Sequence, residues 1–304
     1  MPQTFYEVVW IFIIYAFIGW CTEVAYAALD RGVFVNRGFL NGPYCPIYGC
    51  GVLIVVVILT PLKHNLLILY VGSFLLTSIL EFITGFVMEK IFHNKWWDYS
   101  DKPFNIMGYV CLKFSILWGL ACTFIMLVIH PLVYGFIRII PHIAGVIILI
   151  IIMTCFAVDL VVTVSTIIKF NKRLKLMNEI AARLKVISNE IGENVYENVM
   201  EALEKKETIS DELDHVKTGM EYQKLFISAG VKESVAEAKE KIRLRKEQES
   251  LVSRYRELYH KRNRITGRLL KAFPGMKSRE YNEILEKLRQ YNIERKNRRK
   301  QDGK

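Results

Sequence analysis

The stretch LLILYVGSFLLTSILEFITGFVMEKIF, residues 66–92, decides the fold class of this chain. Its only charged side chains are Glu81, Glu89 and Lys90. A helix needs about 20 predominantly apolar residues to cross the roughly 30 Å hydrocarbon core of a membrane. A β-barrel strand would have about ten residues of alternating polarity, so this longer, continuously apolar stretch predicts a transmembrane helix.

Four further stretches approach or exceed that length. We therefore predict an all-α, polytopic membrane domain over residues 1–169, followed by a long cytoplasmic helical or coiled-coil tail over residues 170–304. The five predicted transmembrane helices cover residues 5–29, 46–62, 66–92, 108–134 and 141–169. A signal peptide is the alternative for the first stretch, but no basic segment precedes it and its apolar run is too long.

Charged residues divide the chain into two dissimilar parts. Residues 1–169 contain nine Lys or Arg and eight Asp or Glu, whereas residues 170–304 contain 32 and 22. This distribution excludes a single soluble globular domain, a disulfide-linked secreted scaffold and a wholly disordered chain. The connections after the first and third spans, like the tail, are richer in Lys and Arg than the opposite connections. The positive-inside rule therefore predicts an outside N-terminus and a cytoplasmic C-terminus.

Five of the ionisable side chains within the predicted spans are informative, because hydrocarbon penalises a charge that has no partner or water. They are Glu23, Glu81, Glu89, Lys113 and Asp159. Helical spacing places Glu81 and Glu89 on one polar stripe and Asp159 on another. We predict that both stripes face Lys113 across a polar cavity, a transport path open to the cytoplasm. Structural pairing or snorkelling is the alternative for Glu23, Glu89 and Lys113, whereas Glu81 and Asp159 lie too deep to snorkel easily.

Two connections on the predicted cytoplasmic side, one after the first span and one after the third, are unusually apolar for loops. Residues 31–51, RGVFVNRGFLNGPYCPIYGCG, combine turn signals with large apolar side chains. We expect this loop to lie on the membrane face or to be partly re-entrant. The loops would bring five residues to the mouth of the cavity: Arg37, Asn41, Tyr48, Trp97 and Asp98. Trp96 is expected to lie in the aromatic belt at the membrane interface.

Four sequence runs carry a resemblance to a known family: GWCTEVAY, NRGFLNGPYCPIYGCG, EFITGFVMEKIF and WWDYSDKPFNIMGYVCLKFSILWG. They resemble a bacterial family of five-to-six-span membrane proteins catalogued as ABC-transporter permeases, the CmpB-like type IV group. The resemblance covers roughly residues 5–165. It implies a multi-pass protein of the bacterial inner membrane with a part in transport.

The sequence contains no G-x-x-x-x-G-K-[ST] phosphate loop, the motif with which P-loop ATPases bind ATP. An ATP-driven permease built on this chain would therefore need a separate ATPase subunit. We expect no cofactor.

The tail, residues 170–304, has the composition of long charged helices. Apolar residues recur at three- and four-residue spacing from Leu174 to Val199 and from Leu251 to Leu269, which indicates amphipathic or coiled-coil helices. These helices could pack against each other, bind a partner protein or form a homo-oligomer. The final basic run would bind anionic lipid or remain solvated; it contains Arg295, Lys296, Arg298, Arg299 and Lys300. Nucleic acid is not expected, because no recognition fold accompanies the charge.

Three functions are compatible with these features. The first is a permease-like membrane transport protein with a cytoplasm-facing polar cavity. The second is a membrane scaffold or sensor that acts through its coiled-coil tail. The third is an intramembrane lipid-modifying enzyme, but no nucleophile–base pair or set of metal ligands is recognisable. We therefore predict no catalytic residue and no bound metal.

Overall fold

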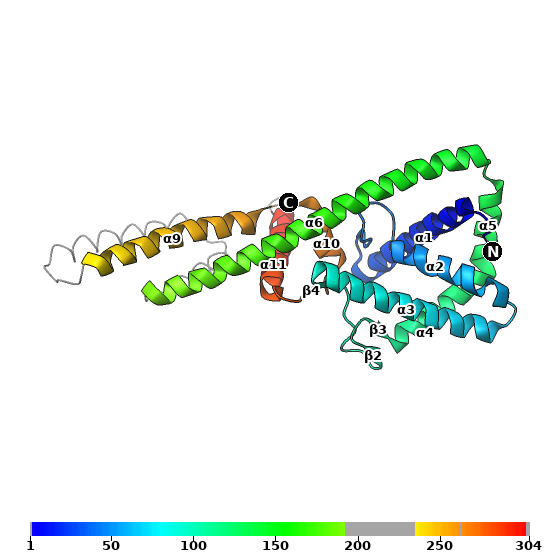
Figure 1. Ribbon diagram of the computed structural model, residues 1–304, viewed down its shortest axis with the longest axis horizontal. Coiled ribbons are helices and arrows are strands. Elements are labelled where there is room, and N and C mark those ends of the chain that lie inside the picture. The colour runs from blue at the N-terminus through cyan, green and yellow to red at the C-terminus, as the bar shows by residue number, and fades with distance from the viewer. Residues whose placement is uncertain (1, 192–234, 262, 302–304) are drawn as a thin grey trace. The chain divides into compact units, whose positions relative to one another are not determined.

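The computed structural model describes residues 2–191, 235–261 and 263–301 (Figure 1). The chain divides into two units, which we describe separately. The first unit comprises Met1–Asn171 and Asn263–Glu280, and the second comprises Lys172–Arg262 and Tyr281–Lys304. Residues 263–280 of the predicted tail therefore belong to the same unit as the apolar helices.

The first three apolar helices begin and end where local chemistry predicts. Helix α1 (Phe5–Arg31) is capped by the Thr4 hydroxyl and ends at Gly32, whose φ of 63° favours glycine. Pro46 begins α2 (Pro46–Leu59), which continues into the 3₁₀ turn η1 (Thr60–Leu62). The Asn65 side chain caps α3 (Leu66–Phe92), which has the bounds predicted from the sequence.

The fourth apolar helix differs from the prediction at its start. It consists of α4 (Leu112–Phe124), the π-helical segment η2 (Ile125–Ile129) and α5 (His130–Ile139). The preceding residues form a hairpin of β2 (Asn105–Ile106) and β3 (Val110–Cys111), so the helix begins after residue 108. The π-helical segment lies just before Pro131, which cannot donate a backbone hydrogen bond within the helix.

Helix α6 (His142–Ile191) continues far beyond the predicted fifth span, residues 141–169. The sequence contains neither Gly nor Pro between residues 146 and 191, so no residue breaks the helix where the composition changes from apolar to charged. Figure 1 draws α6 as one helix without a break. It belongs to the first unit up to Asn171 and to the second unit from Lys172.

Four helices are long and apolar enough to span a membrane: Phe5–Arg31, Leu66–Phe92, Leu112–Ile139 and His142–Glu190. The remaining predicted span corresponds to a shorter apolar helix, Pro46–Leu62. The first unit is therefore a helical, multi-pass membrane domain. Many of its large apolar side chains lie on outward faces; Ile79, Ile83, Ile147 and Ile151 are at least half exposed.

The core of the first unit lies between α1, α2, α3 and α4. Trp10, Ile11 and Tyr15 of α1 pack in one cluster with Val55 and Val56 of α2, and all five are buried. α3 contributes Leu69 and α4 contributes Cys122 to the same cluster. Gly19 permits a close approach of α1 to α2, because the Tyr48 side chain of α2 lies directly against it.

The loops between α1 and α2 and between α3 and α4 meet at one end of the helices, which we call the loop end. Helix α10 (Arg264–Ala272) and strand β4 (Lys277–Ser278) also belong to it. β4 pairs antiparallel with β1 (Asn94–Lys95), with Asn94 opposite Ser278. This pairing joins residues far apart in sequence and fixes the C-terminal segment on the loop after α3.

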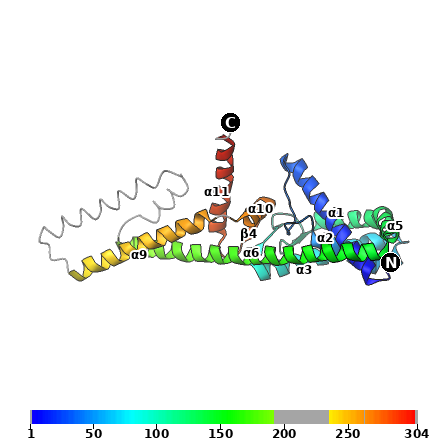
Figure 2. The same ribbon diagram turned by 90° about the horizontal axis from the view of Figure 1, so that it is seen from above.

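In the second unit, α9 (Val235–His260) runs antiparallel to the C-terminal part of α6 (Figures 1 and 2). Arg183 of α6 forms a bidentate ion pair with Glu247 of α9, at 2.7 and 3.0 Å. The predicted seam residues of α6 are buried here: Leu174, Met177, Ala181, Leu184 and Ile187. This described part of the apolar seam is thus covered within the chain, whereas its predicted continuation to Val199 lies outside the described residues.

The second predicted seam, Leu251 to Leu269, is not continuous. α9 ends at His260, and Asn263 caps the separate helix α10 by accepting hydrogen bonds from the amides of Ile265 and Thr266. Tyr255 and Tyr259 are the buried residues of α9 near this end, rather than Leu251 and Leu258. Leu269 is buried in the first unit instead.

Gly19 provides a test of the packing of α1 on α2. A Cβ atom at this position would lie 2.3 Å from Cγ of Tyr48, so alanine must displace the tyrosine ring. We expect Gly19→Ala to lower the free energy of unfolding by about 1–3 kcal/mol, the usual cost of overpacking. Thermal denaturation of the purified protein in detergent measures this loss.

The matched control is Gly135→Ala in α5, where an added Cβ meets no atom within 4 Å. Equal denaturation midpoints for the two variants would contradict the close contact between α1 and Tyr48.

Candidate functional site

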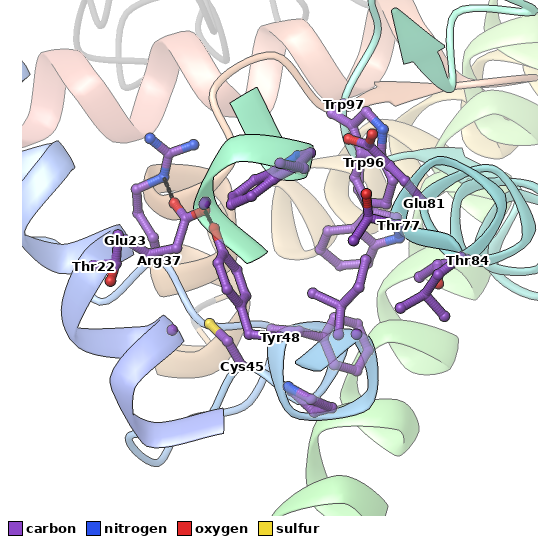
Figure 3. Close-up of a pocket in the computed structure, with 18 of the residues that line it drawn as sticks. Thr22, Glu23, Arg37, Cys45, Tyr48, Thr77, Glu81, Thr84, Trp96 and Trp97 are labelled. Atoms are coloured by element: carbon purple, nitrogen blue, oxygen red, sulfur yellow. Dashed lines mark hydrogen bonds and ion pairs between the residues drawn. The ribbon is translucent and has the colours of Figure 1, made fainter. Parts of the chain in front are cut away.

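A cavity of about 600 Å³ lies inside the first unit at the loop end (Figure 3). Its walls come from α1, α2, α3 and α4, from both loops and from residues 273–275. On α1 the lining extends from Tyr15 to Arg31, about 24 Å along the helix axis at 1.5 Å per residue. On α3 it follows one face, through Thr77, Leu80, Glu81, Thr84 and Met88. The cavity therefore reaches from the loops deep into the apolar helices.

Glu23, Arg37 and Tyr48 form one polar group on the cavity wall. Nε of Arg37 lies 3.2 Å from Oε2 of Glu23, and the Tyr48 hydroxyl donates a 2.6 Å hydrogen bond to Oε1 (Figure 3). The predicted loop residues Arg37 and Tyr48 are thus brought to the predicted span residue Glu23. The ion pair offsets the cost of placing these charges among apolar helices.

Glu81 is the deepest carboxyl group on the α3 wall. Its side chain is 8% exposed, and the Tyr99 hydroxyl lies 3.4 Å from Oε1. Oε2 has no hydrogen-bond partner among the described residues. Thr77 and Thr84 line the cavity one helical turn to either side (Figure 3). Their placement agrees with the predicted inward-facing position of Glu81.

Asp98 lies at the cavity wall in the loop after α3, where it binds two lysines. Lys277 approaches Oδ2 at 2.7 Å and Lys95 approaches Oδ1 at 3.2 Å. Although partial burial acts in the opposite direction, hydrogen bonds from Lys277, Ser100 and Lys95 hold the pKa of Asp98 well below its usual range. Asp98 therefore stays ionised and holds β4 against the loop.

Trp96 and Trp97 both line the cavity. The Trp97 indole donates a 2.8 Å hydrogen bond to the carbonyl of Tyr109. Trp96 is only 4% exposed and packs edge-on against Phe39 and Phe273, at centroid distances of 5.2 and 5.0 Å. The expectation that Trp96 lies in an interfacial aromatic belt is therefore wrong, because an aromatic cluster surrounds it.

Asp159 does not line the cavity and does not meet Glu81. Its oxygens accept hydrogen bonds from the backbone amides of Asn41 and Gly42, at 3.1 and 2.7 Å. They also accept from the Asn41 side chain at 2.7 Å and from the Thr163 hydroxyl at 3.2 Å. The predicted convergence of the two polar stripes is thus wrong, because Asp159 is used to anchor the loop that contains Asn41.

Glu89 and Lys113 also lie outside the cavity lining. Glu89 accepts a 2.8 Å hydrogen bond from the Tyr109 hydroxyl. Lys113 is exposed near the start of α4. The roles of these two charges stay a prediction. The predicted cluster of five intramembrane charges is reduced at the cavity to Glu23 and Glu81.

Sequence reasoning missed the contribution of α10 to the loop end. Arg268 donates hydrogen bonds to the carbonyls of Gly38 and Phe39 at 2.6 and 2.9 Å, and to Asn41 Oδ1 at 3.1 Å. The sequence does indicate where this helix begins and ends, because Asn263 precedes it and the Phe273-Pro274-Gly275 run follows it. That signal could not show where the helix packs.

The predicted lipid-binding run, Arg295 to Lys300, lies in α11 (Asn282–Gln301). The side chains of Arg295, Lys296, Arg298, Arg299 and Lys300 lie outside the described residues.

The long apolar helices define a multi-pass helical membrane protein. Residues 10–164 match the model of the family described as "Putative ABC-transporter type IV", the CmpB family. The match covers just over half of the 304 residues, and the chain belongs to this family. The resemblance seen in the loop motifs is thereby confirmed. No solved structure matches the chain.

Asp159 allows a test of the loop anchor. In Asp159→Asn, an NH₂ group replaces one carboxylate oxygen. This NH₂ group cannot accept the hydrogen bonds that the oxygen accepts from the backbone or side-chain donors around it. We expect the substitution to lower the free energy of unfolding by about 1 kcal/mol, because a partly buried donor loses its acceptor. The measurement is the thermal midpoint in detergent, with the exposed Asp101→Asn as the control. An unchanged midpoint for Asp159→Asn would remove Asp159 as the anchor.

The lowered pKa of Asp98 predicts how the stability of the protein depends on pH. Because its folded pKa lies below the usual value, its contribution is present above about pH 4, the unfolded pKa. It is lost as the pH falls towards the lower folded pKa. We expect wild type to be more stable than Asp98→Asn near pH 6, with the difference shrinking below about pH 4. Denaturation midpoints across this range measure it, and a constant difference would disprove the assignment.

Proposed function

We propose that this chain is the membrane-spanning subunit of a transport system, a permease whose solute occupies the loop-end cavity. The observation that supports this proposal best is the cavity of about 600 Å³, which places Glu23, Arg37 and Glu81 within a bundle of apolar helices. Ionisable groups at such positions are costly and typically mark a solute or ion path. The family's description points to the same class of function.

The proposed orientation places the loop end in the cytoplasm and the N-terminus outside, in a bacterial inner membrane. Arg31, Arg37 and Lys95 lie at the loop end, whereas the opposite connections contain Lys63 and Arg138. The positive-inside rule favours cytoplasmic placement of the more basic end. The cavity would then open to the cytoplasm, and the C-terminal tail would lie on the side of the membrane where anionic lipids attract basic segments.

An ATP-driven cycle would require a second subunit, because the chain has no phosphate-binding loop. Tagged protein purified from native membranes should then bring with it a chain that contains this loop and hydrolyses ATP. Purification without any such ATPase would exclude an ATP-driven mechanism under those conditions.

The alternative roles have less support. A scaffold that recruits a partner or a second copy through an exposed coiled-coil seam is disfavoured, because α9 covers the α6 seam within the chain. A lipid-modifying enzyme would need an activated nucleophile or metal. Glu23 and Asp98 at the cavity are instead held in ion pairs, so we propose no catalytic role.

Glu81 gives the transport proposal its direct test. Wild-type protein in proteoliposomes should take up at least one solute from a panel of amines, amino acids, sugars and organic acids. Glu81→Gln should reduce that uptake at least about tenfold, because a buried charge contact contributes a few kcal/mol.

Glu89→Gln is the matched control, since Glu89 lies two turns along the same helix and outside the cavity lining. Uptake that responds equally to both substitutions, or to neither, would argue against a path through the cavity.

A further inference from the structure

The acids that line the loop-end cavity differ in how their charges are compensated. Glu23 pairs with Arg37, and Asp98 pairs with Lys95 and Lys277. For Glu81, the described residues provide no cationic partner and only the 3.4 Å contact with the Tyr99 hydroxyl. A carboxyl group buried in this way must either remain protonated or meet a cation that comes from outside the chain.

Aromatic rings line the same cavity as Glu81. Trp97 packs against Gly85, one helical turn from Glu81, with Cζ2 3.2 Å from the position of an added Cβ. Trp118 of α4 packs edge-on against Tyr48 at 5.3 Å, and both rings line the cavity. Aromatic faces attract organic cations, most strongly where water is excluded. A cavity lined by these rings and by a carboxyl group with no cationic partner among the described residues thus suits an ammonium group.

The deeper wall of the cavity is apolar. Ile18 of α1, Val52 of α2, Leu80 of α3 and Ile125 all line it. A ligand that places a cation at Glu81 would therefore extend a hydrocarbon portion between these side chains. Metal ions fit poorly, because Ca²⁺ and Mg²⁺ require about six oxygen ligands and the described residues provide no cluster of three or more ionisable ligand groups.

We infer that the cavity binds an amphipathic organic cation, whose ammonium group pairs with Glu81 and whose apolar portion lies between α1, α2 and α3. This inference rests on the proposed function for its biological meaning, since it names the class of solute. Two kinds of molecule have this chemistry: free lipophilic amines, and lipids with choline or ethanolamine head groups.

Equilibrium binding of three matched probes tests the inference. They are hexyltrimethylammonium, its neutral isostere with a tert-butyl group, and hexanesulfonate. The full-length protein is placed in phosphatidylglycerol nanodiscs, and empty nanodiscs give the background. We expect the cation to bind at least about tenfold more tightly than the neutral isostere, and the sulfonate to bind more weakly still.

Glu81→Gln should abolish the preference for the cation over the neutral isostere. Glu81→Asp keeps the charge and should retain the preference with weaker binding, which separates charge from folding. Glu89→Gln should bind as wild type does. Equal binding of cation and isostere by wild type, or an unchanged preference in Glu81→Gln, would overturn the inference.

Adding phosphatidylethanolamine to the nanodiscs distinguishes the two sources of the ammonium group. A lipid head group in the cavity would compete and weaken probe binding, whereas a site for free amines would leave it unchanged. Recognition of the ammonium group itself is decided by the preference for the cation over the neutral isostere. Cation binding without any uptake would refute the proposed transport function alone, and Glu81-dependent uptake without cation binding would refute the inference alone.

Discussion

The arrangement of the loop end depends on how the charges of its acidic side chains are compensated among apolar helices. An ionised group among apolar helices is tolerated only when partners replace its lost hydration. Asp159 obtains backbone amides, Glu23 obtains Arg37, and Asp98 obtains two lysines. Each compensating contact also positions a segment of chain. The 36–45 loop, the loop after α3 and the C-terminal strand β4 are held in place by the same interactions that make the acids acceptable.

Most of the helical architecture could be predicted from the sequence. The run at 66–92 has the bounds of α3, because an Asn cap and a polar loop delimit an uninterrupted apolar stretch. The fourth helix begins later than predicted, since residues 108–111 belong to a hairpin whose turn contains Met107 and Gly108 at positive φ. Apolar composition alone does not distinguish the start of a helix from a strand such as β3, whose residues Val110 and Cys111 are buried.

The site could be predicted only in part. Helical spacing correctly indicates which residues of one helix share a face, so Glu81 was placed on an inward-facing stripe. It does not indicate which neighbour that face meets, and Asp159 faces the 36–45 loop instead of Glu81. The contacts of Arg268 and Lys277 join segments separated by well over a hundred residues. No local pattern determines such a pairing, because it depends on how the whole unit closes.

The 36–45 loop shows how a non-helical segment can lie at the end of an apolar bundle. Backbone groups there need partners, since hydrocarbon provides none. Asn36 accepts from the Trp20 indole at 2.8 Å and donates to the carbonyl of Asn41 at 2.7 Å, while Asp159 accepts from the loop amides. The carbonyls of Gly38 and Phe39 still need donors, and Arg268 provides them. Asp159 lies within the region that matches the family, residues 10–164, whereas Arg268 lies beyond it. Within the family region, Asp159 and Asn36 bond other groups of this loop, and the C-terminal segment completes its hydrogen bonding through Arg268, which donates to the carbonyls of Gly38 and Phe39. This contact gives residues 263–280 a structural reason to pack with the membrane helices.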